Sequence, residues 1–189
     1  PEDFHTMAQD RRDKGFTVIQ IVAGLYPDML PFDERGKNEG GFPWDRDFTE
    51  INPAYFDAAD RKILSLVEHG LCPCIVGSWG FFMKFAGKEA LKRHWDYLIA
   101  RWAALPVIWC AAGEANMTFY DEQISMEEHL KRSRHDWNDM VRYIRERDSF
   151  HRLVTIHPTA YGHEQVEDDG LLDLDMLQTG HGGGPSLAP

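Results

Sequence analysis

Cysteine is scarce in this sequence of 189 residues. The three cysteines are Cys72, Cys74 and Cys110, and all of them fall in segments that are predicted as buried strands. Two cysteines that are two residues apart on one strand have poor geometry for a disulfide bridge. No second cysteine pair exists to complete a zinc site with Cys72 and Cys74. We therefore expect three buried thiols, without a disulfide framework and without a bound metal.

Positive charge and long apolar runs are also scarce. The chain has 20 Lys and Arg against 31 Asp and Glu, with a formal net charge of −11 and a pI near 5.2. Nucleic acids and anionic membranes bind through basic side chains that neutralise phosphates, so the composition disfavours both partners. No apolar run approaches the roughly 20 residues of a membrane-spanning helix. With 43% hydrophobic residues, the composition is typical of a globular domain, and an uncharged substrate fits it best.

Strand-like and helix-like segments alternate along the chain. Five apolar or β-branched segments are predicted as strands, and they begin near Phe16, Cys72, Val107, Leu153 and Leu174. Helices are predicted over residues 2–14, 53–68, 88–104 and 125–147. Asn52-Pro53 has the pattern of an N-cap and a first-turn proline, and Ser125 to Glu128 has capping-box spacing. This alternation favours a parallel sheet.

Polar or aromatic residues follow the end of each predicted strand. They are Gln20, Ser78, Trp79, Glu114, Asn116, His157, Gln178 and His181. An open sheet would concentrate such residues at one crossover point, whereas every strand of a barrel ends at the same mouth. The sequence therefore predicts an α/β fold of the (β/α)8 TIM-barrel type. Because a complete barrel needs roughly 250 residues, we expect residues 1–189 to form a partial barrel domain that covers about strands 2 to 6.

Glu114 is the predicted catalytic residue. It follows the uniformly apolar strand 107–112, which should be buried on both faces, and so lies where parallel folds keep their chemistry. Glycoside hydrolysis uses two carboxyl groups, one of which protonates the leaving oxygen. Such an acid needs apolar surroundings, for which Trp79 and Trp109 are the candidates. The predicted substrate-binding residues are Gln20, Trp79, Asn116, His157, Gln178 and His181.

The longest irregular segment, residues 24–51, is rich in aromatic side chains. Loops of this length in a domain are more often functional than not. The aromatic residues predict a wall on which sugar rings stack. They are Tyr26, Phe32, Phe42, Trp44 and Phe48.

Five segments of the chain resemble the apiosidase-like barrel family, glycoside hydrolase family 140 and its uncharacterised relatives. They are GFTVIQ at 15–20, INPAYF at 51–56, VIW at 107–109 with Gly113-Glu114, TIHP at 155–158 and MLQTGH at 176–181. The segments match in order and at family spacing over nearly the whole chain. The resemblance implies a TIM barrel that hydrolyses glycosidic bonds in plant polysaccharide and needs no cofactor.

The same resemblance implies two catalytic carboxylates. The acid/base after the fourth barrel strand maps onto Glu114, where the family usually has Asp. The nucleophilic glutamate after the seventh strand, which implies a retaining mechanism, has no counterpart in these 189 residues, so we expect the fragment alone to be inactive. We also expect its unpaired barrel edges to favour association. The family suggests a bacterial and exported enzyme. No signal peptide occurs in these residues, but this says nothing about export, because we expect the natural N-terminus to lie before them.

Two alternatives remain open from the residues themselves. Histidines after two strands, His157 and His181, are also where a metal-dependent amidohydrolase would hold zinc, although no His-x-His pair occurs in the chain. A carbohydrate-binding barrel without hydrolytic activity is the second alternative. The other histidines beside helices, among them His94 and His129, are predicted to be solvated or at the edge of the core.

Overall fold

The computed structural model describes residues 2–25, 32–117 and 123–179. Its centre is one parallel sheet with the strand order β1-β2-β3-β4. The strands are β1 (Val18–Leu25), β2 (Cys72–Ser78), β3 (Ile108–Gly113) and β4 (Val154–His157). Each strand pairs in parallel with the next strand along the chain, so each helical connection adds one strand on the same side. The predicted parallel sheet of alternating strands and helices is confirmed.

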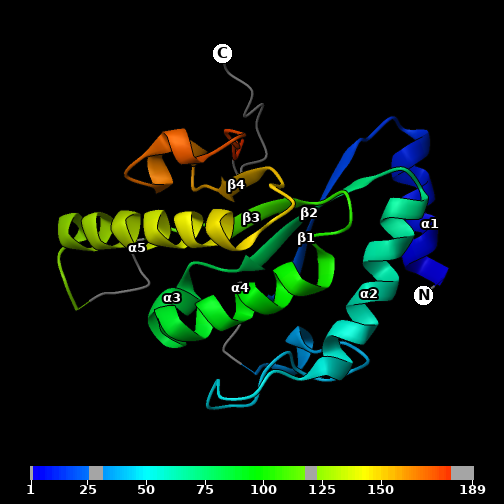
Figure 1. Ribbon diagram of the computed structural model, residues 1–189, viewed down its shortest axis with the longest axis horizontal. Coiled ribbons are helices and arrows are strands. Elements are labelled where there is room, and N and C mark those ends of the chain that lie inside the picture. Colours follow the sequence, from blue (N-terminus) through cyan, green and yellow to red (C-terminus); the bar gives the residue numbers. More distant parts are fainter. Residues whose placement is uncertain (1, 26–31, 118–122, 180–189) are drawn as a thin grey trace.

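Helices connect the strands and cover one face of the sheet (Figure 1). They are α1 (Glu2–Asp13), α2 (Pro53–Glu68), α3 (Phe81–Phe85), α4 (Lys88–Trp102) and α5 (Met126–Arg147), with the short 3-10 helices η1 (Glu34–Gly36), η3 (Gly162–Gln165) and η4 (Asp169–Leu171). Both predicted caps are present, since Asn52 accepts from the backbone N–H of Ala54 and Ser125 from that of Glu128. The five residues of α3 were not predicted, because a single turn is too short to show a period. No helix in the described ranges is long and apolar enough to cross a bilayer.

The predicted fifth strand, from Leu174 to Gln178, is wrong. The segment makes an isolated antiparallel bridge between Leu177 and Tyr161. Before that bridge, the Asp173 carboxylate accepts from the Val154 N–H at 2.8 Å, and the Thr155 hydroxyl donates to the Leu174 carbonyl at 2.7 Å. Short polar side chains compete with strand ladders for backbone groups in this way. The aspartate therefore takes a backbone donor of β4 that a fifth strand would have used.

Large apolar side chains are exposed at both edges of the sheet. Phe16 and Val18 are 50% and 42% exposed at the β1 edge, and Leu153 is 47% exposed at the start of β4. Leu177, in the segment beside β4, is 59% exposed. Association through these edges remains a prediction, and the exposed side chains are the observation that supports it.

The sheet is strongly curved, as a barrel wall must be. In a flat sheet β1 and β4 would be separated by three strand spacings, about 14 Å. Instead, Gln20 of β1 and His157 of β4 meet across the concave face, with 3.2 Å between Gln20 Oε1 and His157 Nδ1. The residues on this concave face include Cys74, which is paired in register with Gln20.

The opposite, convex face carries the aromatic core. Trp109 of β3 packs edge-on against Trp95 of α4, with ring centroids 5.8 Å apart, and its indole N–H donates to Asp148 at 2.8 Å. Trp95 in turn lies directly on Gly77 of β2, where a Cβ would come within 2.5 Å of the ring. This contact requires glycine at position 77 and brings α4 close to the sheet.

His94 joins this core to the long loop between β1 and α2. It is fully buried, so the prediction that it is solvated or at the edge of the core is wrong. Its Nδ1 accepts from the Trp44 indole N–H at 3.1 Å, and its Nε2 donates to the Gly77 carbonyl at 2.7 Å. Burial, which is the largest cause, lowers the pKa of His94 from 6.5 to about 4. The neutral imidazole therefore has a structural role, because its two hydrogen bonds join the long loop to β2.

The aromatic residues of the long loop serve the same core. Trp44 and Phe48 are only 3% and 7% exposed, so the prediction that they form a sugar-stacking wall is wrong for both. Phe32 and Phe42 are half-buried and pack against each other edge-on. Tyr26 lies outside the described residues. The loop is thus folded inward over α4 and α3, where its rings extend the core.

The buried His94 predicts a loss of stability in acid. Between pH 6.5 and about pH 4 the unfolded chain binds a proton at this site that the folded protein does not, so stability falls as pH falls. The loss attributable to His94 should reach about 3 kcal/mol by pH 4. Thermal unfolding followed by circular dichroism across this range measures it. His94→Gln should flatten the dependence and the exposed-site control His135→Gln should not; an equally steep slope in both variants would contradict the assignment.

Candidate functional site

Glu114 stands directly after β3, in a backbone conformation that side chains rarely adopt. Its φ is +44°, in the left-handed region. Such a conformation costs about 1–3 kcal/mol and persists only where the surroundings impose it. Here the Glu114 N–H donates to the His157 carbonyl at 2.8 Å, and the Gly80 N–H donates to the Gly113 carbonyl at 2.7 Å. The ends of three strands therefore hold this residue.

The carboxylate of Glu114 accepts a hydrogen bond on each oxygen. The Trp79 indole N–H donates to Oε2 at 3.2 Å, and the Gln178 amide donates from Nε2 to Oε1 at 3.2 Å. Glu114 is only 8% exposed. Its orientation is therefore set by partners from two other segments of the chain.

Trp79 connects Glu114 with the rest of the concave face. Its ring lies on Gly113, where a Cβ would come within 2.0 Å of the ring, so only glycine allows this contact. The Trp79 and His157 rings are tilted against each other with centroids 5.5 Å apart. His157 reaches Gln20 through its Nδ1. A continuous set of contacts thus links Gln20, His157, Trp79, Glu114 and Gln178.

The remaining predicted residues do not join this set. Asn116 is 5% exposed and its amide donates to the Glu164 carbonyl of η3 at 3.3 Å, so it lies at an interior contact between the β3 end and the loop after β4. Trp109 points to the convex face, and the prediction that it supplies apolar surroundings for Glu114 is wrong. The reason is strand alternation, which places Trp109 and Cys110 on opposite faces. His181 lies outside the described residues.

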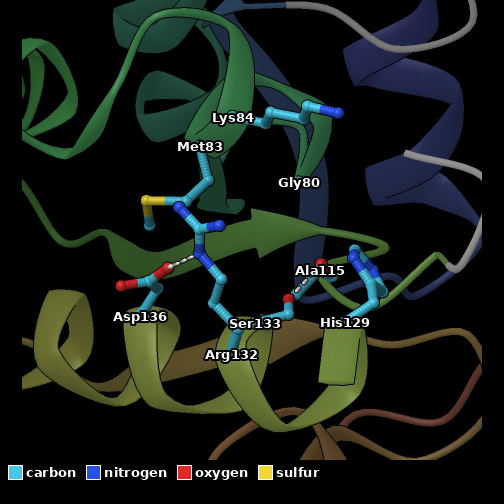
Figure 2. Close-up of a pocket in the computed structure, with 8 residues that line it drawn as sticks. All are labelled: Gly80, Met83, Lys84, Ala115, His129, Arg132, Ser133 and Asp136. Carbon is cyan, nitrogen blue, oxygen red and sulfur yellow. Dashed lines mark hydrogen bonds and ion pairs between the residues drawn. The ribbon is translucent and has the colours of Figure 1, made fainter. Parts of the chain in front are cut away.

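A small hollow lies behind the Glu114 backbone, between α3 and α5 (Figure 2). Its volume of about 60 Å³ exceeds the roughly 10–15 Å³ that one water molecule needs. Its lining residues are Gly80, Met83, Lys84, Ala115, His129, Arg132, Ser133 and Asp136. In Figure 2 the Ser133 hydroxyl donates to the Ala115 carbonyl, at 2.9 Å. Ser133 therefore anchors the loop that carries Glu114, a role that an isolated serine on the inner face of a predicted helix does not signal.

His129, at the edge of this hollow, is buried with 8% exposure, so the prediction that it is solvated or at the edge of the core fails for this residue too. The three residues 129, 133 and 137 recur at helical spacing on the inner face of α5, and all are buried. Because His129 and Ser133 are polar, the hydrophobic pattern of the sequence did not predict that this part of α5 is buried.

The segment that carries Gln178 is held by hydrogen bonds between His163 and Asp175. His163 of η3 contacts the Asp175 carboxylate through Nδ1 at 2.8 Å, and its backbone N–H donates to the same side chain at 2.9 Å. The side-chain hydrogen bond raises the pKa of His163 above 6.5. Within the described ranges, no three His, Cys, Asp or Glu side chains are grouped to hold a metal ion.

Comparison with solved structures shows the fold. The chain resembles a glycoside hydrolase family 5 protein from Bacteroides vulgatus ATCC 8482, with a TM-score of 0.69, 20% identity, and coverage of 95% of this chain and 37% of that one. A Bacteroides ovatus family 5 xyloglucanase in complex with a XXXG heptasaccharide gives a TM-score of 0.58 and 18% identity over 80% of this chain and 32% of that one. An endo-1,4-beta-D-mannanase from Thermotoga petrophila RKU-1 gives a TM-score of 0.54 and 17% identity over 84% of this chain and 51% of that one.

The chain thus spans a third to a half of the length of these structures, and its sheet corresponds to part of their (β/α)8 barrel. A comparison with curated proteins gives no match. A family model described as "Apiosidase-like, catalytic domain" matches residues 1–188. The curved parallel sheet, the carboxylate after β3 and this match agree, and the chain belongs to the apiosidase-like family as a glycoside-hydrolase-like domain.

Proposed function

We propose that this chain is the part of a glycoside hydrolase that carries the general acid/base, and that the enzyme acts on plant-type polysaccharide or oligosaccharide. The observation that carries the proposal is the carboxylate of Glu114, which is held by Trp79 and Gln178 at the C-terminal end of β3. In parallel barrels this end of the strands is where catalytic groups lie. Glu114 would protonate the glycosidic oxygen as the bond to the sugar breaks.

The reaction needs a second carboxyl group, about 5–5.5 Å from the first in a retaining enzyme. The concave face near Glu114 presents Gln20, His157 and Gln178, none of which is a carboxylate. We place the nucleophile on a later strand of the barrel, in the polypeptide that carries residues 1–189, and expect these residues alone to be inactive. The two carboxyl groups would then flank the bond from different strands.

The structural relatives suggest a class of substrate, and the geometry of the concave face suggests which side chains contact it. The xyloglucanase and the mannanase among the structural relatives are named for polysaccharide substrates, which supports a polysaccharide here. Gln20 and His157 form a polar pair on the concave face, and we assign them to hydrogen bonds with sugar hydroxyls. Trp79 is 8% exposed and its indole is engaged by Glu114, so we assign it to holding the carboxylate more than to stacking on a sugar.

The metal-dependent alternative gains no support from the described residues. His157 directs Nδ1 to Gln20, and the second histidine that this alternative needs, His181, lies outside the described ranges. The non-catalytic carbohydrate-binding barrel is an outcome of the first experiment below: it predicts binding of oligosaccharide without turnover.

Glu114→Gln tests the proposed role directly. The amide keeps the size and hydrogen-bonding capacity of the side chain but has no proton to transfer, so hydrolysis of a natural oligosaccharide should fall roughly 10²- to 10⁴-fold. Steady-state kinetics on the full-length enzyme measure the loss. Glu127→Gln, at an exposed position in the first turn of α5, is the matched control and should leave the rate unchanged.

A substrate with a good leaving group separates catalysis from binding. Such a leaving group departs without protonation, so the first chemical step in Glu114→Gln should be nearly normal, and azide should rescue the second step in a retaining enzyme. Equal losses on both substrates would show that Glu114 acts in binding or structure, and an unchanged rate on both would remove the proposal.

Trp79→Phe tests whether the indole N–H supports Glu114. Phenylalanine keeps an aromatic ring on Gly113 but removes the donor to Oε2, and a hydrogen bond to a charged group is worth about 1.5–3 kcal/mol. We expect kcat/KM to fall about tenfold or more and the melting temperature to fall as well, because the bond and part of a buried ring are lost. The control Trp102→Phe removes an indole bond to Asp60 on the outer helices, so it should lower the melting temperature and spare kcat/KM. A lower melting temperature with an unchanged kcat/KM in Trp79→Phe would make Trp79 a purely structural residue.

A further inference from the structure

The two hydrogen-bond partners of Glu114 differ in what they can do. The indole N–H of Trp79 can only donate, so it can bond to a lone pair of Oε2 but cannot accept a hydrogen bond from a protonated Oε2. The side chain of Gln178 carries a donor and an acceptor on the same amide. At Oε1 this amide can donate to a carboxylate or, after rotation, accept from a carboxylic O–H. The two oxygens of Glu114 are therefore not equivalent.

A general acid/base has to pass through both protonation states in each turnover. When Glu114 holds a proton that has not yet turned toward the glycosidic oxygen, the donor-only Trp79 disfavours Oε2 as the protonated atom, which leaves Oε1. When the proton has moved to the glycosidic oxygen and the C–O bond has broken with its electron pair on that oxygen, Oε1 again needs a donor. The Gln178 amide, which lies 3.2 Å from Oε1, can supply both needs.

We propose that Gln178 is a positioning residue whose amide serves Glu114 in both protonation states, as acceptor for the acid and donor for the carboxylate. This inference rests on the proposed function of Glu114. It replaces the predicted role of Gln178 as a substrate contact. The terminal amide torsion of glutamine is broad, so the rotation meets no steep rotamer barrier.

The backbone around Gln178 is well held, which leaves the amide as the part that turns. The Gln178 N–H donates to the Ala160 carbonyl at 3.0 Å, and the Gly162 N–H donates to the Met176 carbonyl at 2.8 Å. The antiparallel bridge between Tyr161 and Leu177 lies between these two bonds. Because neighbouring residues of an extended segment point to opposite faces, Leu177 turns away while Gln178 faces Glu114.

Several titratable groups surround this pair in the described part of the chain. His157 of β4 bonds to the Glu114 backbone through its carbonyl and contacts the Trp79 ring. His163 and Asp175, which are paired with each other, and the exposed Tyr161 belong to the loop that carries Gln178. Glu164 of η3 accepts from Asn116 through its backbone carbonyl. All of them are retained in the variants below, so their titration is common to every profile.

The test is a pH–rate profile of the full-length enzyme with Gln178→Met, which keeps the side-chain length and removes both donor and acceptor. The amide bonds more strongly to the charged carboxylate than to the neutral acid, so if it serves both states of Glu114, its loss favours the acid only by the difference between the two bonds. We then expect kcat/KM to fall about tenfold while the alkaline limb moves up by less than about one pH unit. Gln9→Met, at a half-buried position of α1, is the matched control and should reproduce the parent profile.

Two results would overturn the inference. A partner that only donates favours the carboxylate by the worth of a hydrogen bond to a charged group, so its loss would move the alkaline limb up by about one pH unit or more. A shift of about one unit or more therefore makes Gln178 a donor alone. An unchanged rate would show that Gln178 does not act on Glu114 at all. Circular dichroism checks that the variant is folded.

Gln178→Glu keeps the inference testable if the methionine variant does not fold. Two carboxyl groups at this separation share one proton, so the alkaline limb should move up by a unit or more. An unshifted limb would mean that residue 178 is not within reach of Glu114 in the working enzyme. Failure of the proposed function is distinguishable from all of these outcomes, because it would appear as normal activity of Glu114→Gln.

Discussion

The close approach of Trp79 to Gly113 is the contact on which the site depends. Because glycine has no Cβ, an indole from the end of β2 can lie flat on the end of β3. This places its N–H against the Glu114 carboxylate and its ring against His157. Any side chain at position 113 would push the indole away, and the links from β2 to β3 and β4 at the barrel mouth would separate. The same kind of contact between an indole ring and a glycine occurs on the convex face, where Trp95 lies on Gly77.

Around this contact, the segments after the strands are fastened to one another by polar groups. Ser133 and Asn116 tie the residues on the far side of Glu114 to α5 and η3. Arg134 donates twice to the Val166 carbonyl, so the loop after β4 is also attached to α5. That loop delivers Gln178 to the carboxylate. A strained residue with φ of +44° is thereby held between three independently anchored segments, which is the condition under which such strain persists.

Much of the fold was predictable because its signals are local. The caps at Asn52 and Ser125, the four predicted helices and the first four predicted strands depend on patterns that act within about ten residues, and all of these elements are present. The fifth strand failed for an equally local reason that a hydrophobic pattern does not contain. Asp173 satisfies the backbone of β4 with its own side chain, so an apolar segment next to it stays irregular.

The sequence by itself determined the alternation of strands and helices, the parallel sheet and the position of a carboxylate at a strand end, because these follow from periodicity and from the polarity of single residues. Only the tertiary structure decided which side chains meet. Gln20 and His157 are 137 residues apart, yet the curvature of the sheet brings them within 3.2 Å. His94 is buried and accepts a hydrogen bond from Trp44 because the long loop folds back over α4. The path of such a loop depends on contacts between distant residues, which no local sequence pattern encodes. The Glu114 site is built from such long-range contacts, since Trp79 and Gln178, which donate hydrogen bonds to its carboxylate, lie 35 and 64 residues away in the chain.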